Sequence, residues 1–167
     1  SGFQGLGNIT MDSNGYLVVT DRSANKVYRL SKDGESKEII AGNGLSGSGT
    51  QLVAATESAL DGVRGVWFLD DNTFFLATHE GSQIWYVDQE GTTHLFLDGK
   101  DGDEYHFGDG QNYRTPGYKI SEPRSVSVDF DGNVLVVEND RGFVRNISKE
   151  HVNNFVEDIF SSPRDFL

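Results

Sequence analysis

The sequence contains no cysteine, and it has only 3 prolines and 1 methionine. The absence of cysteine excludes disulfide bonds and thiolate metal sites, and it is compatible with any cellular compartment. No apolar run approaches the roughly 20 residues that a membrane-spanning helix requires. Basic residues are also few, since 14 Lys and Arg stand against 26 Asp and Glu and give a formal net charge of −12. Because no run of Lys or Arg forms a basic patch, neither a nucleic acid nor an anionic membrane is an expected partner.

The residues that are present suffice for one folded domain. A chain of 167 residues that is 36% hydrophobic and 11% aromatic can bury a core of its own. One stretch, residues 122–140, raises the question of function because of its five carboxylates: Glu122, Asp129, Asp131, Glu138 and Asp140. The stretch is either a metal site or one unit of a repeated structure.

A sequence repeat favours the second of these two interpretations. The pattern recurs without gaps at residues 6–34, 63–91 and 123–151, at offsets of 57 and 60 residues. A fragment at residues 162–164 ("SPR") is similar to residues 122–124 ("EPR"), as if a fourth copy were starting. Self-similarity at such a period indicates a solenoid, a propeller or an array.

Each copy predicts four β-strands. A short first strand is followed by a turn of Asn, Asp and Gly, which tolerate positive φ. The second strands, at residues 16–20, 73–77 and 133–137, are apolar on consecutive residues, which indicates burial on both faces. After a third strand comes a more polar fourth strand, expected at residues 36–41, 92–97 and 153–158. No segment shows a sustained helical period, and only residues 52–60 predict a short helical turn.

These features predict an all-β chain of four-stranded, antiparallel β-propeller blades. A two-sheet sandwich is the alternative, but sandwich strands alternate between apolar and polar residues, and the second strands here do not. We place the blades at about residues 6–41, 63–98 and 123–158 of a single domain, with residues 159–167 as the start of a further blade.

The units also resemble the NHL-repeat β-propeller family. The third copy carries the family's pattern at Pro123, Val126, Val128, Asp129, Gly132, Asn133, Val134, Val136 and Glu138. The first copy matches at Asp12, Gly15, Val19, Asp21, Asn25, Val27, Asp33 and Gly34, and the second copy is looser. The resemblance implies the fold and leaves the function open, because such propellers bind proteins, RNA or carbohydrates, and related six-bladed folds include metal-dependent hydrolases and lyases.

The number of blades has a consequence for assembly. Closed propellers have about 4 to 8 blades, and this chain supplies three and the start of another. Either the chain is part of a larger propeller, or copies of it associate to close the ring. A homodimer would give six blades and leave no open edge, in keeping with the closed symmetry of most oligomers.

The repeat gives the carboxylates a structural interpretation. Calcium takes six to eight oxygen ligands, and EF-hand spacing is absent whether counted from Asp129 or from Asp101. Because counterparts recur in the other copies, we interpret the acids as turn formers and strand ends. None of the four histidines has the spacing of a zinc motif. No cofactor is expected, and calcium held in the central channel is the alternative, with Glu138 and Asn139 as its first candidates.

Three arginines are the clearest binding candidates. Arg64, Arg124 and Arg164 hold the same place in successive units, at the start of the innermost strand, where the first copy has Gly7. Since inner strands line a propeller's channel, the guanidinium groups could form part of a ring that binds an anion at one mouth. In the alternative interpretation, each arginine pairs with a carbonyl or an acid and holds the blades in register.

Two long links, residues 42–62 and 99–122, cross the same face of the predicted disc. Loops of this length often carry function. The second link has a composition typical of a binding rim, with Tyr105, His106 and Tyr113, although a solvated lid is the alternative. We therefore predict a non-enzymatic module that binds a protein or a carbohydrate through this loop-bearing face. A calcium-dependent hydrolase or lyase of the six-bladed type, and a fragment without independent activity, are the alternatives.

Overall fold

The computed structural model describes residues 2–99, 120–139 and 142–161, which form three antiparallel sheets and one helix. Blade 1 consists of β1 (Leu6–Met11), β2 (Leu17–Asp21), β3 (Lys26–Leu30) and β4 (Lys37–Ala41). Blade 2 consists of β5 (Val63–Phe68), β6 (Phe74–Thr78), β7 (Gln83–Val87) and β8 (Thr93–Asp98). Blade 3 consists of β9 (Pro123–Val128), β10 (Val134–Glu138) and β11 (Val144–Ile147), and α1 (Lys149–Ser161) follows it.

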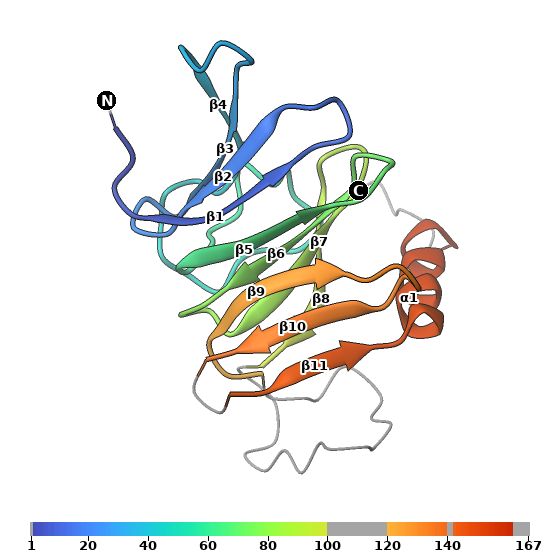
Figure 1. Cartoon of the computed structure of the whole chain (residues 1–167). Helices are drawn as coiled ribbons and strands as arrows, with labels where there is room; N and C mark the ends of the chain where they lie inside the picture. Colours follow the sequence, from blue (N-terminus) through green and yellow to red (C-terminus); the bar gives the residue numbers. More distant parts are fainter. Residues whose placement is uncertain (1, 100–119, 140–141, 162–167) are drawn as a thin grey trace, which may run out of the picture.

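The three sheets stack face to face in chain order, and their first strands lie side by side (Figure 1). Within each sheet the strands follow one another in sequence, as in a meander. This is the arrangement of consecutive β-propeller blades around an inner row made of β1, β5 and β9. The all-β propeller fold predicted from the sequence is therefore confirmed. In the described part of the chain, no helix combines the length and the apolar character needed to cross a membrane.

The turns between first and second strands have the structure that the carboxylates predicted. Asp12 Oδ1 accepts backbone N–H groups of Asn14 (3.0 Å) and Tyr16 (2.9 Å). Asp129 Oδ1 does the same for the residues two and four positions further on, at 3.0 and 2.9 Å. The same position in each of the three turns has positive φ: Gly15 (79°), Asn72 (68°) and Gly132 (89°). The interpretation of these acids as turn formers is confirmed.

Two apolar junctions hold the three blades together. We call the face that a blade directs toward the next blade its trailing face, and the opposite face its leading face. At the first junction, Val18, Val27 and Ala41 on the trailing face of blade 1 pack against a leading face that includes Val66 and Trp85. The second junction buries the trailing face of blade 2 against blade 3 through these residues: Phe75, Ala77, Ile84, Tyr86, Val126, Val134 and Val136. Each junction is an apolar core between two sheets.

The fourth strand predicted at residues 153–158 is wrong, because α1 occupies this segment. In blades 1 and 2 the turn before the fourth strand has positive φ at Gly34 (75°) and Gly91 (79°). The equivalent residue of blade 3 is His151, which disfavours that turn. Residues 159–161, which we had assigned to a further blade, form the end of α1, and residues 162–167 lie outside the described residues.

The expectation that no segment has a helical period is wrong for the same reason. The side chain of Ser148 accepts the backbone N–H of His151 at 3.3 Å, which caps the first turn of the helix. The apolar residues then follow at helical spacing, and they pack on the core between blades 2 and 3: Val152, Phe155, Val156 and Ile159. The helix therefore buries an apolar stripe in the place where a fourth strand was expected.

The exposure of two strands also differs from the expectation. The second strand of blade 3 was expected to be buried on both faces, but Val137 is 41% exposed because no described segment covers its side of β10. The outer strand β8 belongs to the strands predicted to be more polar, but it is largely buried. The link between blades 1 and 2 runs along its edge, where the N–H of Leu52 bonds the carbonyl of Thr93 at 2.8 Å. Residues 52–60 contain bends, an isolated β-bridge between Ala54 and Thr92 and one turn at residues 55–57, and the expected helical turn does not form.

Candidate functional site

Each inner strand carries a β-bulge at the same position of the repeat. The pairing of β5 with β6 shifts between Val63 and Gly65, so Arg64 is the extra residue. The pairing of β9 with β10 shifts in the same place and leaves Arg124 as the extra residue. The corresponding irregularity in β1 contains Gly7. A bulge releases its extra residue from the ladder and redirects its side chain, so the fold aims Arg64 and Arg124 out of the sheet.

The glycines beside these bulges allow the inner strands to approach one another closely. A Cβ atom on Gly7 would lie 2.5 Å from Thr20 Oγ1 and 3.1 Å from the carbonyl oxygen of Arg64. A Cβ atom on Gly65 would lie 2.9 Å from the backbone nitrogen of Val126. Larger residues at these two positions would push neighbouring blades apart. Close approach therefore explains why the first repeat has glycine where the next two repeats have arginine.

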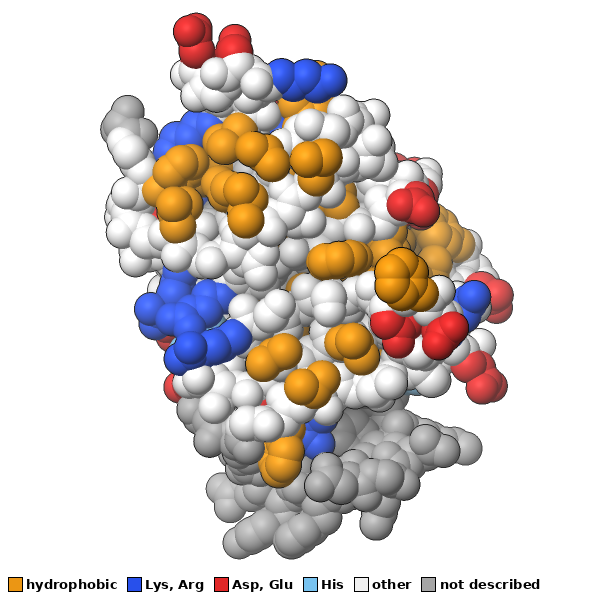
Figure 2. All heavy atoms as spheres, in the orientation of Figure 1, with side chains coloured by type: hydrophobic (Ala, Val, Ile, Leu, Met, Phe, Trp, Pro, Cys, Tyr) orange, Lys and Arg blue, Asp and Glu red, His pale blue; other side chains and the backbone are white. Residues whose placement is uncertain are grey.

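The two bulge arginines reach the same hollow, which has a volume of about 360 Å³. Its lining consists of Gly5, Leu6, Gly7, Arg22, Ser23, Arg64 and Arg124. Because the strands are antiparallel, the end at which inner strands begin is also the end at which second strands finish and the long links arrive. The hollow therefore lies on the loop-bearing face. Figure 2 shows a group of Lys and Arg side chains at this end of the inner strands.

The charges around the hollow are only partly compensated. Within the described residues, the side chains of Arg64 and Arg124 make no hydrogen bond and no ion pair, and only the backbone carbonyl of Arg64 is engaged, by the hydroxyl of Thr20. Burial and the nearby charges of Arg22 and Arg124 lower the pKa of Arg64 from its usual value, and the carboxylates of Glu80 and Glu122 offset this only in part. An arginine stays protonated at neutral pH all the same. Arg22 differs from the other two, because it forms an ion pair with Glu80. The alternative interpretation, in which each bulge arginine pairs with an acid or a carbonyl, is not seen in the described part of the chain.

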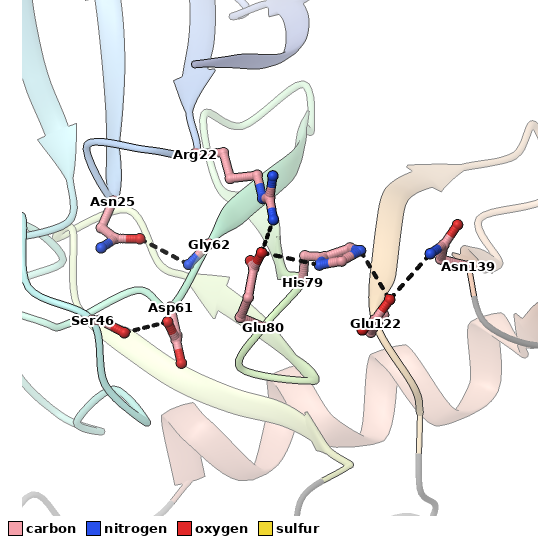
Figure 3. A network of polar contacts seen from close by, with 9 residues as sticks. All are labelled: Arg22, Asn25, Ser46, Asp61, Gly62, His79, Glu80, Glu122 and Asn139. Atoms are coloured by element: carbon pink, nitrogen blue, oxygen red, sulfur yellow. Dashed lines mark hydrogen bonds and ion pairs between the residues drawn. The ribbon is translucent and has the colours of Figure 1, made fainter. Parts of the chain in front are cut away.

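A chain of polar contacts runs beside the hollow and connects all three blades (Figure 3). From the Arg22–Glu80 pair it continues to His79, whose Nδ1 lies 3.4 Å from Glu80 Oε1. The other nitrogen, Nε2, lies 3.3 Å from Glu122 Oε2, and this oxygen accepts a hydrogen bond from Asn139 Nδ2 at 3.1 Å. These contacts bring the loops that surround the arginines next to one another.

His79 is the most buried member of this chain, since its side chain is only 7% exposed. Burial lowers its pKa from the usual value, and the positive charge of Arg64 lowers it further. The carboxylates of Glu80 and Glu122 act in the opposite direction and compensate only in part. His79 is therefore expected to be neutral at neutral pH, and it adds no positive charge to the hollow.

Arg22 was not among the predicted binding residues, although the repeat contains a signal for it. Arg22, His79 and Asn139 occupy the same position of the repeat, in the loop after the second strand. Aligned in this way, the three loops place a polar side chain with hydrogen-bonding groups beside each bulge. The repeat alignment, rather than any single loop, contains the information.

The candidate calcium ligands are engaged in the fold. Glu138 is 1% exposed, and it forms an ion pair with Arg145 Nε and accepts the backbone N–H of Ser121 at 3.3 Å. Asn139 donates its side-chain amide to Glu122. Among the residues that the structure describes, no group of three His, Cys, Asp or Glu side chains is arranged to hold a metal ion. The other predicted binding residues, Arg164, Tyr105, His106 and Tyr113, lie outside the described residues.

No protein-family profile matches the sequence, and no curated protein matches it. Solved structures do match. An auxiliary nutrient binding protein from Bacteroides ovatus superposes with a TM-score of 0.66 at 16% identity over 84% of this chain. A gluconolactonase from Xanthomonas campestris gives a TM-score of 0.58 at 14% identity over 89% of this chain. Virginiamycin B lyase from Staphylococcus aureus, as an inactive variant with quinupristin, gives 0.53 at 15% identity over 87%.

These similarities concern the fold. At such low identity they show that the chain is built as part of a β-propeller, and they leave its membership of the NHL family a prediction. The chain spans 36% of the nutrient binding protein, 46% of the gluconolactonase and 39% of the lyase. It therefore corresponds to less than half of each of these propellers.

Proposed function

We propose that the chain is a non-enzymatic binding module, and that its hollow holds an anionic group of a protein or carbohydrate partner. The observation that carries the proposal is the pair Arg64 and Arg124, which project from equivalent bulges beside one hollow and whose guanidinium groups have no hydrogen-bond or ion-pair partner among the described residues. Guanidinium groups offer several N–H donors in a fixed plane, which suits them to carboxylates.

The volume of the hollow and the net charge of the chain limit the kind of ligand that fits. A volume of about 360 Å³ falls at the lower end of the range for small-ligand sites, which is enough for one sugar residue or one acidic side chain. A polyanion would be repelled by the chain as a whole, which has a net charge of −12. A single carboxylate on an otherwise neutral partner therefore fits better than a nucleic acid or a sulfated polymer.

The similar structures are compatible with a binding role. One of them is named an auxiliary nutrient binding protein, whereas the others are named a lyase and a gluconolactonase. The propeller scaffold thus occurs with both kinds of activity, and the choice between them depends on the site. In the described part of this chain the guanidinium groups of Arg64 and Arg124 are free to bind a ligand. Glu138, the best candidate for a metal ligand, already forms an ion pair with Arg145 and accepts a hydrogen bond from Ser121.

Binding of galacturonate and galactose, measured by titration calorimetry, tests the carbohydrate form of the proposal. The two sugars differ by a carboxylate, so galacturonate should bind more tightly. Arg64→Ala should weaken galacturonate binding by about 10- to 100-fold, because a hydrogen bond to a charged group contributes roughly 1.5–3 kcal/mol. Arg64→Lys should give an intermediate loss, because it keeps the charge but not the planar fork.

The matched control is Lys32→Ala, which removes the same charge from a side chain that lies over the Tyr16 ring, outside the lining of the hollow. It should leave binding unchanged. A short peptide with one Glu, compared with its Gln version, tests the protein form of the proposal in the same way. Equal binding of charged and uncharged probes, or no effect of Arg64→Ala, would contradict the proposal.

The calcium-dependent alternative makes a different prediction. A hydrolase or lyase of that type would contain stoichiometric calcium and would lose thermal stability in a chelator. Metal analysis of the purified chain and melting curves with and without EDTA distinguish the two functions. Bound calcium together with a lower melting temperature in EDTA would replace the binding proposal by the enzymatic one.

A further inference from the structure

The leading face of blade 1 is apolar and uncovered. Its residues Phe3, Ile9, Met11 and Leu17 are between 36% and 60% exposed. Figure 2 shows hydrophobic side chains gathered over β1 and β2 on the near side of the molecule. A contiguous apolar patch on a soluble protein generally marks a contact surface.

The repeat itself indicates what kind of surface fits this patch. The equivalent residues of blade 2 are Leu60, Val66, Phe68 and Phe74, and none of these is more than 8% exposed. They are buried because the trailing face of blade 1 packs on them. Ile120, Val126 and Val134 of blade 3 are buried in the same way by the trailing face of blade 2. A trailing blade face is therefore the natural cover for the patch on blade 1.

The other end of the stack presents such a face. The trailing face of blade 3 carries Leu135, Val137 and Val144, and the two valines are 41% and 64% exposed. Their equivalents in blade 1 include Val18 and Val27, both fully buried at the first junction. The described stack thus presents the two complementary halves of one kind of junction, one half on blade 1 and the other on blade 3.

We propose that a second copy of this chain supplies both missing covers. The trailing face of blade 3 in one copy packs on the leading face of blade 1 in the other, and two-fold symmetry forms the same contact twice. The product has six blades, within the usual range of about 4 to 8. A closed dimer of this kind leaves no apolar blade face exposed. This inference names the surfaces of the self-association expected from the sequence, and it does not depend on the proposed ligand.

The test is the molar mass in solution, measured by light scattering over a range of concentrations. The chain should have about twice its monomer mass of 18.4 kDa. Met11→Lys should disrupt the leading face, and Val137→Lys should disrupt the trailing face, so each variant alone should have the monomer mass. Phe130→Lys is the control, because Phe130 is fully exposed in a turn and lies on neither face, and it should stay dimeric.

A mixture of the two variants sharpens the test. The Met11→Lys chain keeps an intact trailing face and the Val137→Lys chain keeps an intact leading face, so one good junction can form. The equimolar mixture should therefore contain a heterodimer that neither variant forms alone. Circular dichroism shows whether each variant is folded, and both substituted side chains are largely exposed in the single chain.

Three results would overturn the proposal. The first is the monomer mass for the unmodified chain at all concentrations. The second is a dimer that Met11→Lys disrupts and Val137→Lys does not, since this pattern indicates two leading faces packed on each other. The third is a mixture that stays monomeric while the unmodified chain is dimeric, because the two faces would then not be partners.

Discussion

Blades 1 and 2 use equivalent residues in opposite surroundings. Met11 on the leading face of blade 1 is 57% exposed, whereas its counterpart Phe68 is 8% exposed. Both lie at the end of an inner strand, and both belong to an apolar leading face. The repeat determines which way a side chain points, and the presence of a neighbouring blade determines whether that side chain is buried.

Blade 1 covers part of its leading face with its own side chains. Tyr28, the counterpart of Trp85, is only 9% exposed although no blade covers it. The ring of Phe3 packs edge-on against it at 5.7 Å, and Lys37 Nζ lies 4.1 Å from its centroid. An edge blade can thus shield one large aromatic with local contacts, but these contacts do not extend to the inner strand. The difference between the two blades is therefore greatest near the channel.

The largest effect on stability is expected when the two aromatic counterparts, Trp85 and Tyr28, are each replaced by alanine. Trp85 is 1% exposed inside the first junction, so Trp85→Ala should lower the free energy of unfolding by about 3–5 kcal/mol. Tyr28→Ala removes a ring that is covered by the local contacts of Phe3 and Lys37 instead of a blade, and it should cost less, roughly 1–2 kcal/mol. Urea denaturation at a concentration low enough to keep the chain monomeric measures both values. Equal losses would show that local contacts replace a blade completely.

The helix offers a second comparison, between its buried and exposed faces. Phe155 packs edge-on against Phe96 at 5.0 Å and against Tyr86 at 6.1 Å, so Phe155→Ala should cost about 2–3 kcal/mol. Phe160 on the same helix is 56% exposed, and Phe160→Ala should change stability by less than about 0.5 kcal/mol. Urea denaturation again provides the measurement. Two similar values would mean that α1 does not replace the fourth strand as a cover of blade 2.

The blades could be predicted from the sequence because the same strand and turn patterns occur three times in it. Consecutive apolar residues in β2 and β6, and Asx-Gly turns at Asp12 and Asp129, have local causes that a repeat makes visible. The prediction of a fourth strand failed in blade 3, where the third copy departs from the first two. His151 stands where Gly34 and Gly91 have positive φ, and this single difference indicates that the fourth strand does not form.

The candidate site was predictable only in part. Arg64 and Arg124 share a repeat position, so their common direction could be inferred, and the structure brings both to the hollow. Arg22 comes from another loop, and its approach depends on how closely β1 and β5 pack at Gly7. Such closeness between blades is a tertiary property, which strand patterns do not encode.

The smallest effect on stability is expected from the turn between β9 and β10 of blade 3, which contains Asp129. Hydrogen bonds from the Asn133 side chain, at 2.9 Å, and from backbone N–H groups lower the pKa of Asp129 below its usual value. Because the folded state lowers this pKa, the stabilisation is complete above the pKa of the unfolded chain and is lost as the pH falls through the lower, folded value. The urea midpoint of the unmodified chain should therefore fall more between pH 7 and pH 3 than that of Asp129→Asn. Asp131→Asn removes the same charge two residues away and should keep the pH dependence of the unmodified chain, whereas an equal change in both variants would show that the turn contributes no specific interaction.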